Sequence, residues 1–456
     1  MEAITREEKI MSGENLTPIT RKEMFLAKAA GQNIETPEPI TREEMFLSKI
    51  SGGGGGGGSG GGEEWIGDGN TYIWITLQEG RTSPMLGVCP KGTVTVDWGD
   101  GTTPDVLTGT SVSSVAWTPT HEYAKAGDYV IKLTVDGEMG FYGQSSSNAY
   151  SGILRYSTGS DGRNPSYQSS VKKVEVGNGV TSIGNSAFHY CYSLASVKIS
   201  DSVTSIGESA FAACYSLANI TIPDGVTSIG YNVFNGCYSL ASIKIPDSVT
   251  YIGNYAFNAC YSLANITIPD GVTSIGSNAF YGCYSLASIT IPDSVTSIGS
   301  NAFYNCPPLT SITIPDGVTS IGSGVFGSCY SLANITIPDS VTSIGNGAFA
   351  TCHSLASIKI PDSVTSIKDN VFNACYSLAN ITIPDGVTSI GSNAFGSCIG
   401  VRYYDFTNHK SVPSLASTNA FNKISADCEI LVPSALYDEW IAATNWSTYA
   451  DKIVAR

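Results

Sequence analysis

Residues 211–233, FAACYSLANITIPDGVTSIGYNV, decide the fold, because near-copies of this stretch follow one another along half of the chain. Each copy carries a cysteine at the same place, so that a cysteine recurs every 23 residues. The ten members of this cysteine row are Cys191, Cys214, Cys237, Cys260, Cys283, Cys306, Cys329, Cys352, Cys375 and Cys398. A fixed period of this length predicts a solenoid, in which each unit stacks on copies of itself and buries its apolar face only against its neighbours.

Each copy, which we call a rung, places its apolar residues at fixed positions. In the quoted rung these are Leu217, Ile220 and Ile222, then Val226 and Ile229, before the Phe that opens the next rung. We predict that these positions are the core rows. A single rung buries too few side chains to offset the conformational entropy of ordering its backbone, so neighbouring rungs must fold together.

The repeated pattern F-x-x-C-x-S-L-x-x-I-x-I-P-x-x-V-T-x-I-G resembles the BspA-type leucine-rich repeat over about residues 171 to 400. The resemblance implies a leucine-rich-repeat solenoid. It also implies the function of exposed bacterial adhesins of this type, which have no active site and bind host or matrix components. Every rung is nearly the same, so no rung holds the distinct set of groups that catalysis needs.

The cysteine row has three interpretations. Neighbouring Cα atoms in stacked strands lie about 4.8 Å apart, which suits disulfides, but a ladder points all thiols the same way. A metal site needs clustered ligands, and each rung offers one cysteine. We therefore favour small buried side chains in identical environments, and free thiols fit synthesis in a reducing cytosol. Cys89 and Cys428 stand outside the row and are either paired or free.

Two outward rows of the solenoid are candidate binding surfaces. The first, the Thr/Lys row, lies beside Ser and Asn on the main strand, and its polar, nearly uncharged surface suits a glycan or a protein. Thr is also what a strand surface takes by propensity alone, so both interpretations stay open. The Thr/Lys row consists of Lys198, Thr221, Lys244, Thr267, Thr290, Thr313, Thr336, Lys359 and Thr382.

The second candidate surface is the Tyr row, which follows each cysteine. Tyrosine rings stack on sugars and are enriched in protein interfaces, but packing over the neighbouring turn is the simpler alternative. Pro307, His353 and Ile399 interrupt the row. Its tyrosines are Tyr192, Tyr215, Tyr238, Tyr261, Tyr284, Tyr330 and Tyr376.

Residues 63–140 alternate apolar and polar side chains with a period of two, which predicts half-buried antiparallel strands. The stretch V-D-W-G-D-G-T at 96–102 resembles the PKD type of immunoglobulin-like β-sandwich, a module that spaces or holds other domains. Trp98 is expected to fill the space between two sheets. Asp97 and Asp100 are explained by turn chemistry, and we expect no Ca²⁺ there because further oxygen ligands are missing. Residues 141–170 are a Ser-, Gly- and Tyr-rich connector.

Residues 1–50 carry three I-T-R-x-E repeats, each with a Thr and a Glu three residues later that form a capping box. Short helices of this kind are marginal alone, so we predict a docking arm, joined to the rest by the Gly-rich linker 51–62. The arm resembles N-terminal segments of structural and fibre-like proteins in phages and prophages of gut bacteria. Its candidate docking residues are Ile4, Ile19, Phe25, Ile40 and Phe46.

Residues 401–456 lose the repeat and are expected to form a mixed cap over the apolar end of the solenoid. Ser434 is a predicted N-cap for the helical stretch LYDEWIAAT. The segment also resembles the endings of BspA-type repeat proteins of gut bacteria.

Composition excludes several functions. The net charge is −15 and only 14% of residues are charged, which excludes a phosphate-binding surface for nucleic acid and attraction to an anionic membrane. The first twenty residues hold no apolar signal segment, and nowhere is there an apolar run long enough to cross a bilayer. The four histidines are scattered and no catalytic motif is found, so we expect no enzyme, no cofactor and no metal.

These observations predict a mainly β chain: an N-terminal arm of short helices, a PKD-like or immunoglobulin-like sandwich, a leucine-rich-repeat solenoid at 171–400 and a mixed C-terminal cap. We hypothesise a non-enzymatic recognition protein on a virion surface, anchored to the particle or another large assembly by residues 1–50. Its solenoid would bind a host cell-surface protein or glycan. The alternatives are a bacterial cell-surface adhesin, which is extracellular, and a structural spacer without a ligand. By analogy with fibre-like proteins, a homo-oligomer is possible.

Overall fold

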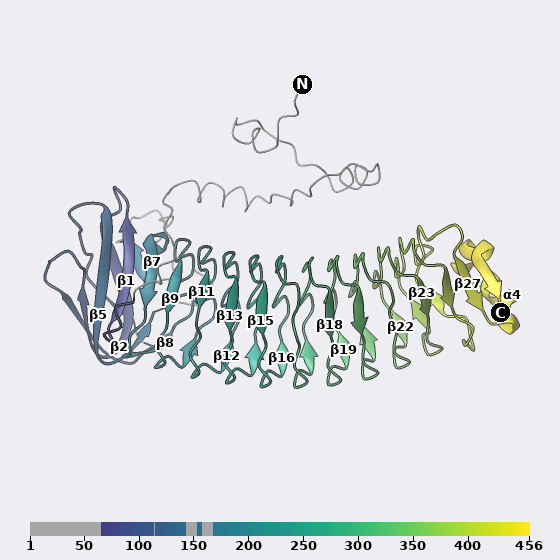
Figure 1. The fold of residues 1–456 in the computed structure, drawn as a ribbon, viewed down its shortest axis with the longest axis horizontal. Helices are drawn as coiled ribbons and strands as arrows, with labels where there is room; N and C mark the ends of the chain where they lie inside the picture. The colour runs from purple at the N-terminus through teal and green to yellow at the C-terminus, as the bar shows by residue number, and fades with distance from the viewer. Residues whose placement is uncertain (1–64, 114, 143–152, 157–166) are drawn as a thin grey trace, which may run out of the picture. The chain divides into compact units, whose positions relative to one another are not determined.

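The computed structural model describes residues 65–113, 115–142, 153–156 and 167–456, which belong to one compact unit, Trp65–Arg456 (Figure 1). Its regular structure is almost entirely β. In the described ranges the α-helix is α4 (Tyr437–Ala442), and no helix there has the length and apolar character needed to cross a membrane. The mainly β fold predicted from the sequence is confirmed, and so is the solenoid of 23-residue rungs.

The N-terminal β region contains β1 (Thr71–Leu77), β2 (Pro84–Asp97), β3 (Asp105–Thr110), β4 (Ala116–Trp117) and β5 (Gly127–Phe141). β2 pairs antiparallel with β3, β4 and β5, and β1 pairs antiparallel with β5. Val94, Val96 and Trp98 are fully buried, as the period-two pattern predicts. The Trp98 indole Nε1 donates to the Asp105 carboxylate at 2.9 Å, so its one polar atom is satisfied inside the core.

The turn after β2 uses its aspartates to bind backbone amides. Asp97 Oδ1 accepts from the Gly99 N–H at 2.9 Å, and Asp100 Oδ1 accepts from the Thr102 N–H at 3.1 Å. Gly101 has a φ of 83°, a conformation that favours glycine. The prediction that turn chemistry explains the two aspartates is confirmed.

The N-terminal β region is continuous with the first rungs of the solenoid. β7 (Val171–Glu175) pairs antiparallel with β1, and β8 (Val180–Ile183) pairs parallel with β5. Between β5 and β7 in the chain, β6 (Leu154–Tyr156) pairs with β2, and η1 (Tyr167–Ser170) is a 3₁₀ turn directly before β7. The rings of Phe141 and Phe188 meet at 5.2 Å. Strands β1 and β5 therefore cover the apolar N-terminal end of the solenoid and extend its two strand rows.

The rungs contribute two rows of short parallel strands. The first strand row contains β7, β9 (Ser196–Lys198), β11 (Asn219–Ile220), β13 (Ser242–Lys244), β15 (Asn265–Thr267), β18 (Ser311–Thr313), β20 (Asn334–Thr336) and β23 (Asn380–Thr382). The second strand row contains β8, β10 (Ser205–Ile206), β12 (Ser228–Ile229), β14 (Tyr251–Ile252), β16 (Ser274–Ile275), β17 (Ser297–Ile298), β19 (Ser320–Ile321), β21 (Ser343–Ile344), β22 (Ser366–Ile367) and β24 (Ser389–Ile390). Paired strands are in register, as in Ile243 opposite Ile266, so equivalent side chains lie one above another.

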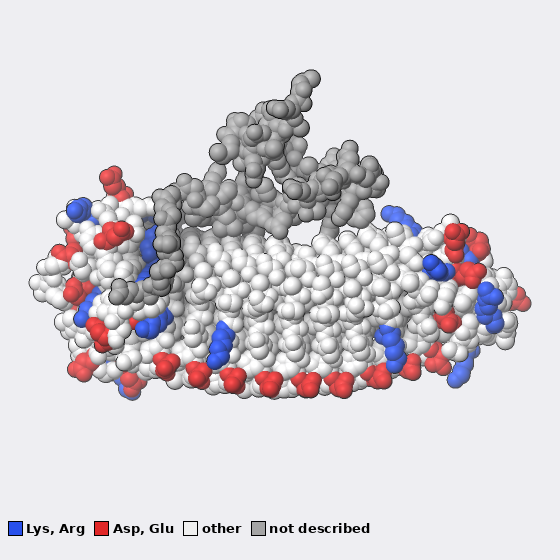
Figure 2. Space-filling view, in the orientation of Figure 1, with Lys and Arg blue, Asp and Glu red and all other residues white. Residues whose placement is uncertain are grey.

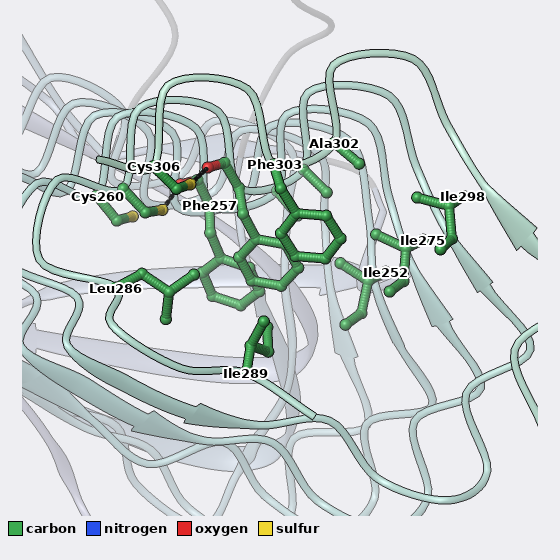
Figure 3. Close-up of a cluster of buried hydrophobic side chains, with 14 of the residues drawn as sticks. Ile252, Phe257, Cys260, Ile275, Leu286, Ile289, Ile298, Ala302, Phe303 and Cys306 are labelled. Atoms are coloured by element: carbon green, nitrogen blue, oxygen red, sulfur yellow. Dashed lines mark hydrogen bonds between the residues drawn. The ribbon is translucent and has the colours of Figure 1, made fainter. Parts of the chain in front are cut away.

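The solenoid core is built from columns of identical side chains (Figure 3). Phenylalanine rings stack along the centre, with Phe280 and Phe303 5.4 Å apart at an interplanar angle of 3°. Leu286 and Ile289 pack on one side of this column and Ile275 on the other, and all are buried. The predicted core rows are confirmed.

The cysteine row lies in this core. Each buried thiol after the first donates to the carbonyl of the phenylalanine that opens the previous rung, as Cys260 does to Phe234 at 3.2 Å. All twelve cysteines, Cys89 and Cys428 included, are free and buried. The interpretation as small buried side chains in identical environments is confirmed.

Every rung bends through a backbone position with a left-handed conformation, three residues after the isoleucine of the second strand row. Most rungs place Asn or Gly there, the residues that adopt positive φ most readily. The occupants are Ser186, Ser209, Asn232, Tyr255, Asn278, Asn301, Gly324, Gly347, Asn370 and Asn393, with φ between 52° and 63°.

The C-terminal cap continues the solenoid. β25 (Tyr403–Asp405), β27 (Glu429–Val432) and β28 (Ile453–Ala455) extend the first strand row, and β26 (Ser414–Leu415) extends the second. The 3₁₀ turns η2 (Ser434–Leu436) and η3 (Trp446–Lys452) flank α4. Trp440 and Trp446 are fully buried beneath this end.

The predicted N-cap role of Ser434 is wrong. Ser434 lies inside η2, and neither η2 nor α4 begins with a side-chain cap hydrogen bond. Its hydroxyl instead donates to the carbonyl of Arg456 at 2.9 Å. The pairing of β27 with β28 brings residues 434 and 456 together, so the Ser434 hydroxyl bonds to the last residue instead of capping a helix.

Candidate binding surfaces of the solenoid

The Thr/Lys row lies on the outward side of the first strand row. All nine of its side chains are exposed, while the isoleucine beside each is buried. Register pairs such as Lys244 with Thr267 and Thr313 with Thr336 place consecutive members side by side. The structure therefore brings the predicted residues into one continuous line. Thr290 and Lys359 belong to rungs where this strand is not formed.

The lysines of this row differ in their partners. Lys198 Nζ lies 3.0 Å from Oε1 of Glu175, whose side chain is only 4% exposed and also accepts from the backbone N–H groups of Ile66 and Gly67. Lys359 Nζ lies 3.0 Å from Asp339 with both side chains largely exposed, a pair that contributes little to stability. In the described part of the chain no ion pair is recorded for Lys244. Lys198 is thus held by the nearly buried Glu175, whereas the exposed Lys244 has no ion-pair partner among the described residues.

An acidic row borders the first strand row along the P-D-G/S turns and the equivalent S-D-S turn of the first rung (Figure 2). The turns are closed by backbone bonds such as Val226 N–H to Pro223 O at 3.0 Å, which leaves the carboxylates at the surface. The row consists of Asp201, Asp224, Asp247, Asp270, Asp293, Asp316, Asp339, Asp362 and Asp385, all exposed. A line of like charges repels anionic ligands from this edge of the solenoid.

The Tyr row is a stack of rings. Centroids of consecutive rings from Tyr192 to Tyr284 are 4.4–4.7 Å apart with nearly parallel planes. A second stack joins Tyr330, His353 and Tyr376 at 4.8 and 4.5 Å. Neighbouring rings cover most ring faces, so stacking on a sugar is limited to the ends of the two stacks. Burial raises the pKa of the Tyr192 hydroxyl to about 12.

A cluster of aromatic rings and lysines at the N-terminal end escaped sequence reasoning. The register of β1 with β7 sets Trp74 opposite Lys173. Lys173 Nζ lies 4.0 Å from the centre of the Trp65 ring and 4.8 Å from that of Trp74, and Lys198 Nζ lies 6.0 Å from Trp65. These are cation–π distances. The cluster extends the Thr/Lys row onto the N-terminal β region, and only the long-range pairing of β1 with β7 reveals it.

The predicted docking residues Ile4, Ile19, Phe25, Ile40 and Phe46 lie outside the described residues. Within the described ranges, no group of three His, Cys, Asp or Glu side chains is placed to hold a metal ion. A surface hollow of about 290 Å³ lies on the second strand row and is lined by Ser366, Asp369 and Gly391 among others.

Comparison with known proteins gives a family match. The sequence matches the family described as BspA type Leucine rich repeat region, in six copies, over residues 164–285 and 296–429. A search of curated proteins gives no match.

Several solved structures are similar to the chain. One is a leucine rich cell surface protein from Faecalibacterium prausnitzii A2-165, with 33% identity and a TM-score of 0.41, covering 58% of this chain and 79% of that one. Another is a leucine rich repeat protein from T. pallidum, with 33% identity and a TM-score of 0.30, covering 40% and 77%. A third, from Bacteroides ovatus, has 25% identity and a TM-score of 0.26, covering 57% and 94%.

Proposed function

The chain belongs to the BspA-type leucine-rich repeat family, and from this membership we propose that it is a recognition protein whose solenoid binds a partner on a cell surface. The observation that carries the proposal is the Thr/Lys row. Its exposed side chains stand in register on paired strands, as Lys244 and Thr267 do, and form one extended surface of small polar groups. Repeated equivalent groups suit a repetitive ligand such as a glycan, or an extended protein surface.

We propose a non-enzymatic role. General acid–base chemistry requires particular groups held together at one place. The rungs instead repeat the same small polar residues, and the carboxylates of the acidic row stand at equivalent turn positions from Asp201 to Asp385. Binding by a long surface needs no such constellation.

A substitution pair tests the Thr/Lys row. In the full chain, Thr290→Arg with Thr313→Arg adds bulk to the first strand row. Thr319→Arg with Thr342→Arg is the matched control, because these threonines are also exposed and immediately precede β19 and β21 of the second strand row. Binding of labelled protein to gut bacterial and epithelial cells is measured by flow cytometry. We expect the first variant to lose at least about tenfold in binding and the control to match the wild type; equal binding by the two variants would refute the role of this row.

We further propose that residues 1–50 attach the chain to a larger assembly, with a phage particle as the leading candidate and the virion surface as the location. The three I-T-R-x-E repeats and the Gly-rich linker 51–62 support this arrangement of arm and tether. In the same proposal, the N-terminal β region is a PKD-like module that supports the solenoid. Mass spectrometry of purified phage particles and of washed cell walls decides between a virion component and a bacterial cell-surface adhesin.

A further inference from the structure

Three exposed tyrosines break the uniformity of the second strand row. Tyr231, Tyr251 and Tyr255 are 41%, 39% and 37% exposed and lie in two adjacent rungs; we call them the tyrosine trio. Tyr251 occupies a strand position where its register partners are Ser228 and Ser274. The core does not require these rings, since other rungs fold with small polar residues in their places.

Tyr255 is also held in a conformation that its side chain disfavours. Its φ is 59°, at the left-handed position that the adjacent rungs fill with Asn232 and Asn278. A bulky residue with positive φ is an outlier that carries conformational strain, and such strain concentrates at functional sites. The backbone is fixed there by two bonds, Tyr255 N–H to Ser277 O at 2.9 Å and Asn258 N–H to Tyr255 O at 3.2 Å. The fold holds a strained tyrosine in place at the surface.

The trio differs from the Tyr row in how its rings are arranged. Tyr231 and Tyr255 meet edge to face, with centroids 5.8 Å apart at an angle of 74°. The rings of the Tyr row, in contrast, lie face to face at less than 5 Å, as in Tyr238 and Tyr261 at 4.6 Å. An edge-to-face pair does not cover both faces of its rings with each other, as a face-to-face stack does, and both tyrosines are more than a third exposed.

A glycine lies between the tyrosines. Gly253 stands two residues from Tyr251 and two from Tyr255, and a Cβ added to it would lie 2.5 Å from the carbonyl carbon of Gly230. The equivalent glycines Gly276 and Gly299 meet the backbone of their preceding rungs in the same way, so glycine at this position lets adjacent rungs approach closely beneath the tyrosines. In later rungs the same positions line the hollow of about 290 Å³, where Ser366 and Ser389 replace Tyr251 and Gly391 replaces Gly253.

From these observations we infer that the tyrosine trio is a binding site for a neutral hexose oligosaccharide, distinct from the Thr/Lys row. The C–H face of a pyranose ring packs on an aromatic face, and the trio offers three exposed rings within two adjacent rungs. Exposed hydroxyls and amides at Ser228 and Asn254 supply polar contacts for the sugar hydroxyls.

The surroundings favour a neutral sugar over other ligands. Residues 227–232, 250–255 and 273–278 read TSIGYN, TYIGNY and TSIGSN, and none of them is charged. A specific protein interface buries about 800 Å² on each partner around an apolar centre, whereas this cluster is framed by Ser, Thr, Asn and Gly. The neutrality of the site and its extent over two adjacent rungs fit one or two sugar rings.

The test uses the full chain and isothermal titration calorimetry with maltohexaose, cellohexaose and mannohexaose, and a hyaluronan hexasaccharide as the charged probe. Variants Tyr251→Ser and Tyr255→Asn restore residues that other rungs carry, so they fold. Tyr281→Asn is the matched control, because Tyr281 stacks on Tyr304 at 5.2 Å outside the trio and Asn258 holds the same position one rung earlier.

We expect at least one neutral hexaose to bind and each trio variant to weaken this binding about tenfold. The Tyr281→Asn control should bind the hexaose like the wild type, and the hyaluronan hexasaccharide should not bind. Absence of binding by every neutral probe, binding by hyaluronan alone, or unchanged affinity in Tyr251→Ser and Tyr255→Asn would each overturn the inference. Thr290→Arg with Thr313→Arg is expected to leave this affinity unchanged, so the outcome is independent of the proposed role of the Thr/Lys row.

Discussion

Replacement of Phe303 by alanine is the most direct test of the phenylalanine column. Phe303 is fully buried, and its ring lies between Phe280 at 5.4 Å and Phe326 at 5.8 Å. Truncation of a buried phenylalanine costs about 3–5 kcal/mol, and the two ring contacts contribute about 0.5–1.5 kcal/mol each beyond their buried area. Backbone hydrogen bonds from Phe280 N–H to Ala302 O and from Phe303 N–H to Val325 O fix the spacing of neighbouring rungs. The rungs therefore cannot move together to fill the cavity that alanine would leave. We expect a loss of about 4–5 kcal/mol in the free energy of unfolding.

Guanidinium unfolding followed by circular dichroism measures this loss. Tyr304→Asn in the same rung is the control, because Tyr304 is only partly buried and stacks on Tyr281 alone among the rings described. Its expected loss is below about 1 kcal/mol. A loss of less than about 2 kcal/mol for Phe303→Ala, or one equal to that of the control, would refute the assignment of the column as the energetic core.

Three further predictions follow from individual side chains. Tyr255→Asn should raise the free energy of unfolding by about 1 kcal/mol, because asparagine adopts positive φ with less strain; thermal unfolding measures the gain. No cysteine should react with a thiol reagent at pH 8 in the folded chain, since burial raises the pKa of Cys329 to about 12 and those of Cys89 and Cys428 to about 11; labelling before denaturation would contradict this. Burial lowers the pKa of His189 from 6.5 to about 4. Between pH 4 and pH 6.5 the unfolded chain therefore binds more protons at this histidine than the folded chain does. The contribution of the neutral His189 to the free energy of unfolding is complete above pH 6.5 and is lost as the pH falls towards 4. The melting temperature of His189→Asn should fall less over this window than that of the wild type.

The regular part of the fold was predictable because every rung poses the same packing problem. Leu217, Ile220 and Val226 recur at fixed spacing, and only a stacked arrangement buries them all. The thiols followed from the same argument, since a side chain repeated in identical contexts has an identical environment.

Features that depend on long-range register were beyond sequence reasoning. The pairing of β1 with β7 decides that Trp74 meets Lys173, and no local pattern encodes that pairing. Ser434 had a plausible N-cap sequence, but the pairing of β27 with β28 brought the Arg456 carbonyl within reach of its hydroxyl. In both cases a distant partner decided the contact.

The tyrosine trio was missed for a different reason. Strand alternation predicts the outward direction of Tyr251, but Tyr231 and Tyr255 lie in the bend after the strand, where alternation no longer applies. The recurrent Asn at the left-handed position, as in Asn278 and Asn301, was the available signal. A tyrosine at that position departs from a preference visible in the neighbouring rungs.

The repetition separates residues that serve packing from those available for recognition. A core column must keep the same side chain in each rung, because each rung packs on its copies, whereas an outward column can vary without disturbing the stack. The second strand row departs from its pattern of small polar residues with bulky or charged side chains, at the tyrosine trio and at Lys368, which stands where other rungs have glycine and lines the hollow with Asp369. The outward positions of the first strand row vary only between threonine and lysine and between serine and asparagine. Small polar side chains repeated in register suit a ligand that repeats, and local departures suit a ligand of one or two units, so we propose different ligands for the two strand rows.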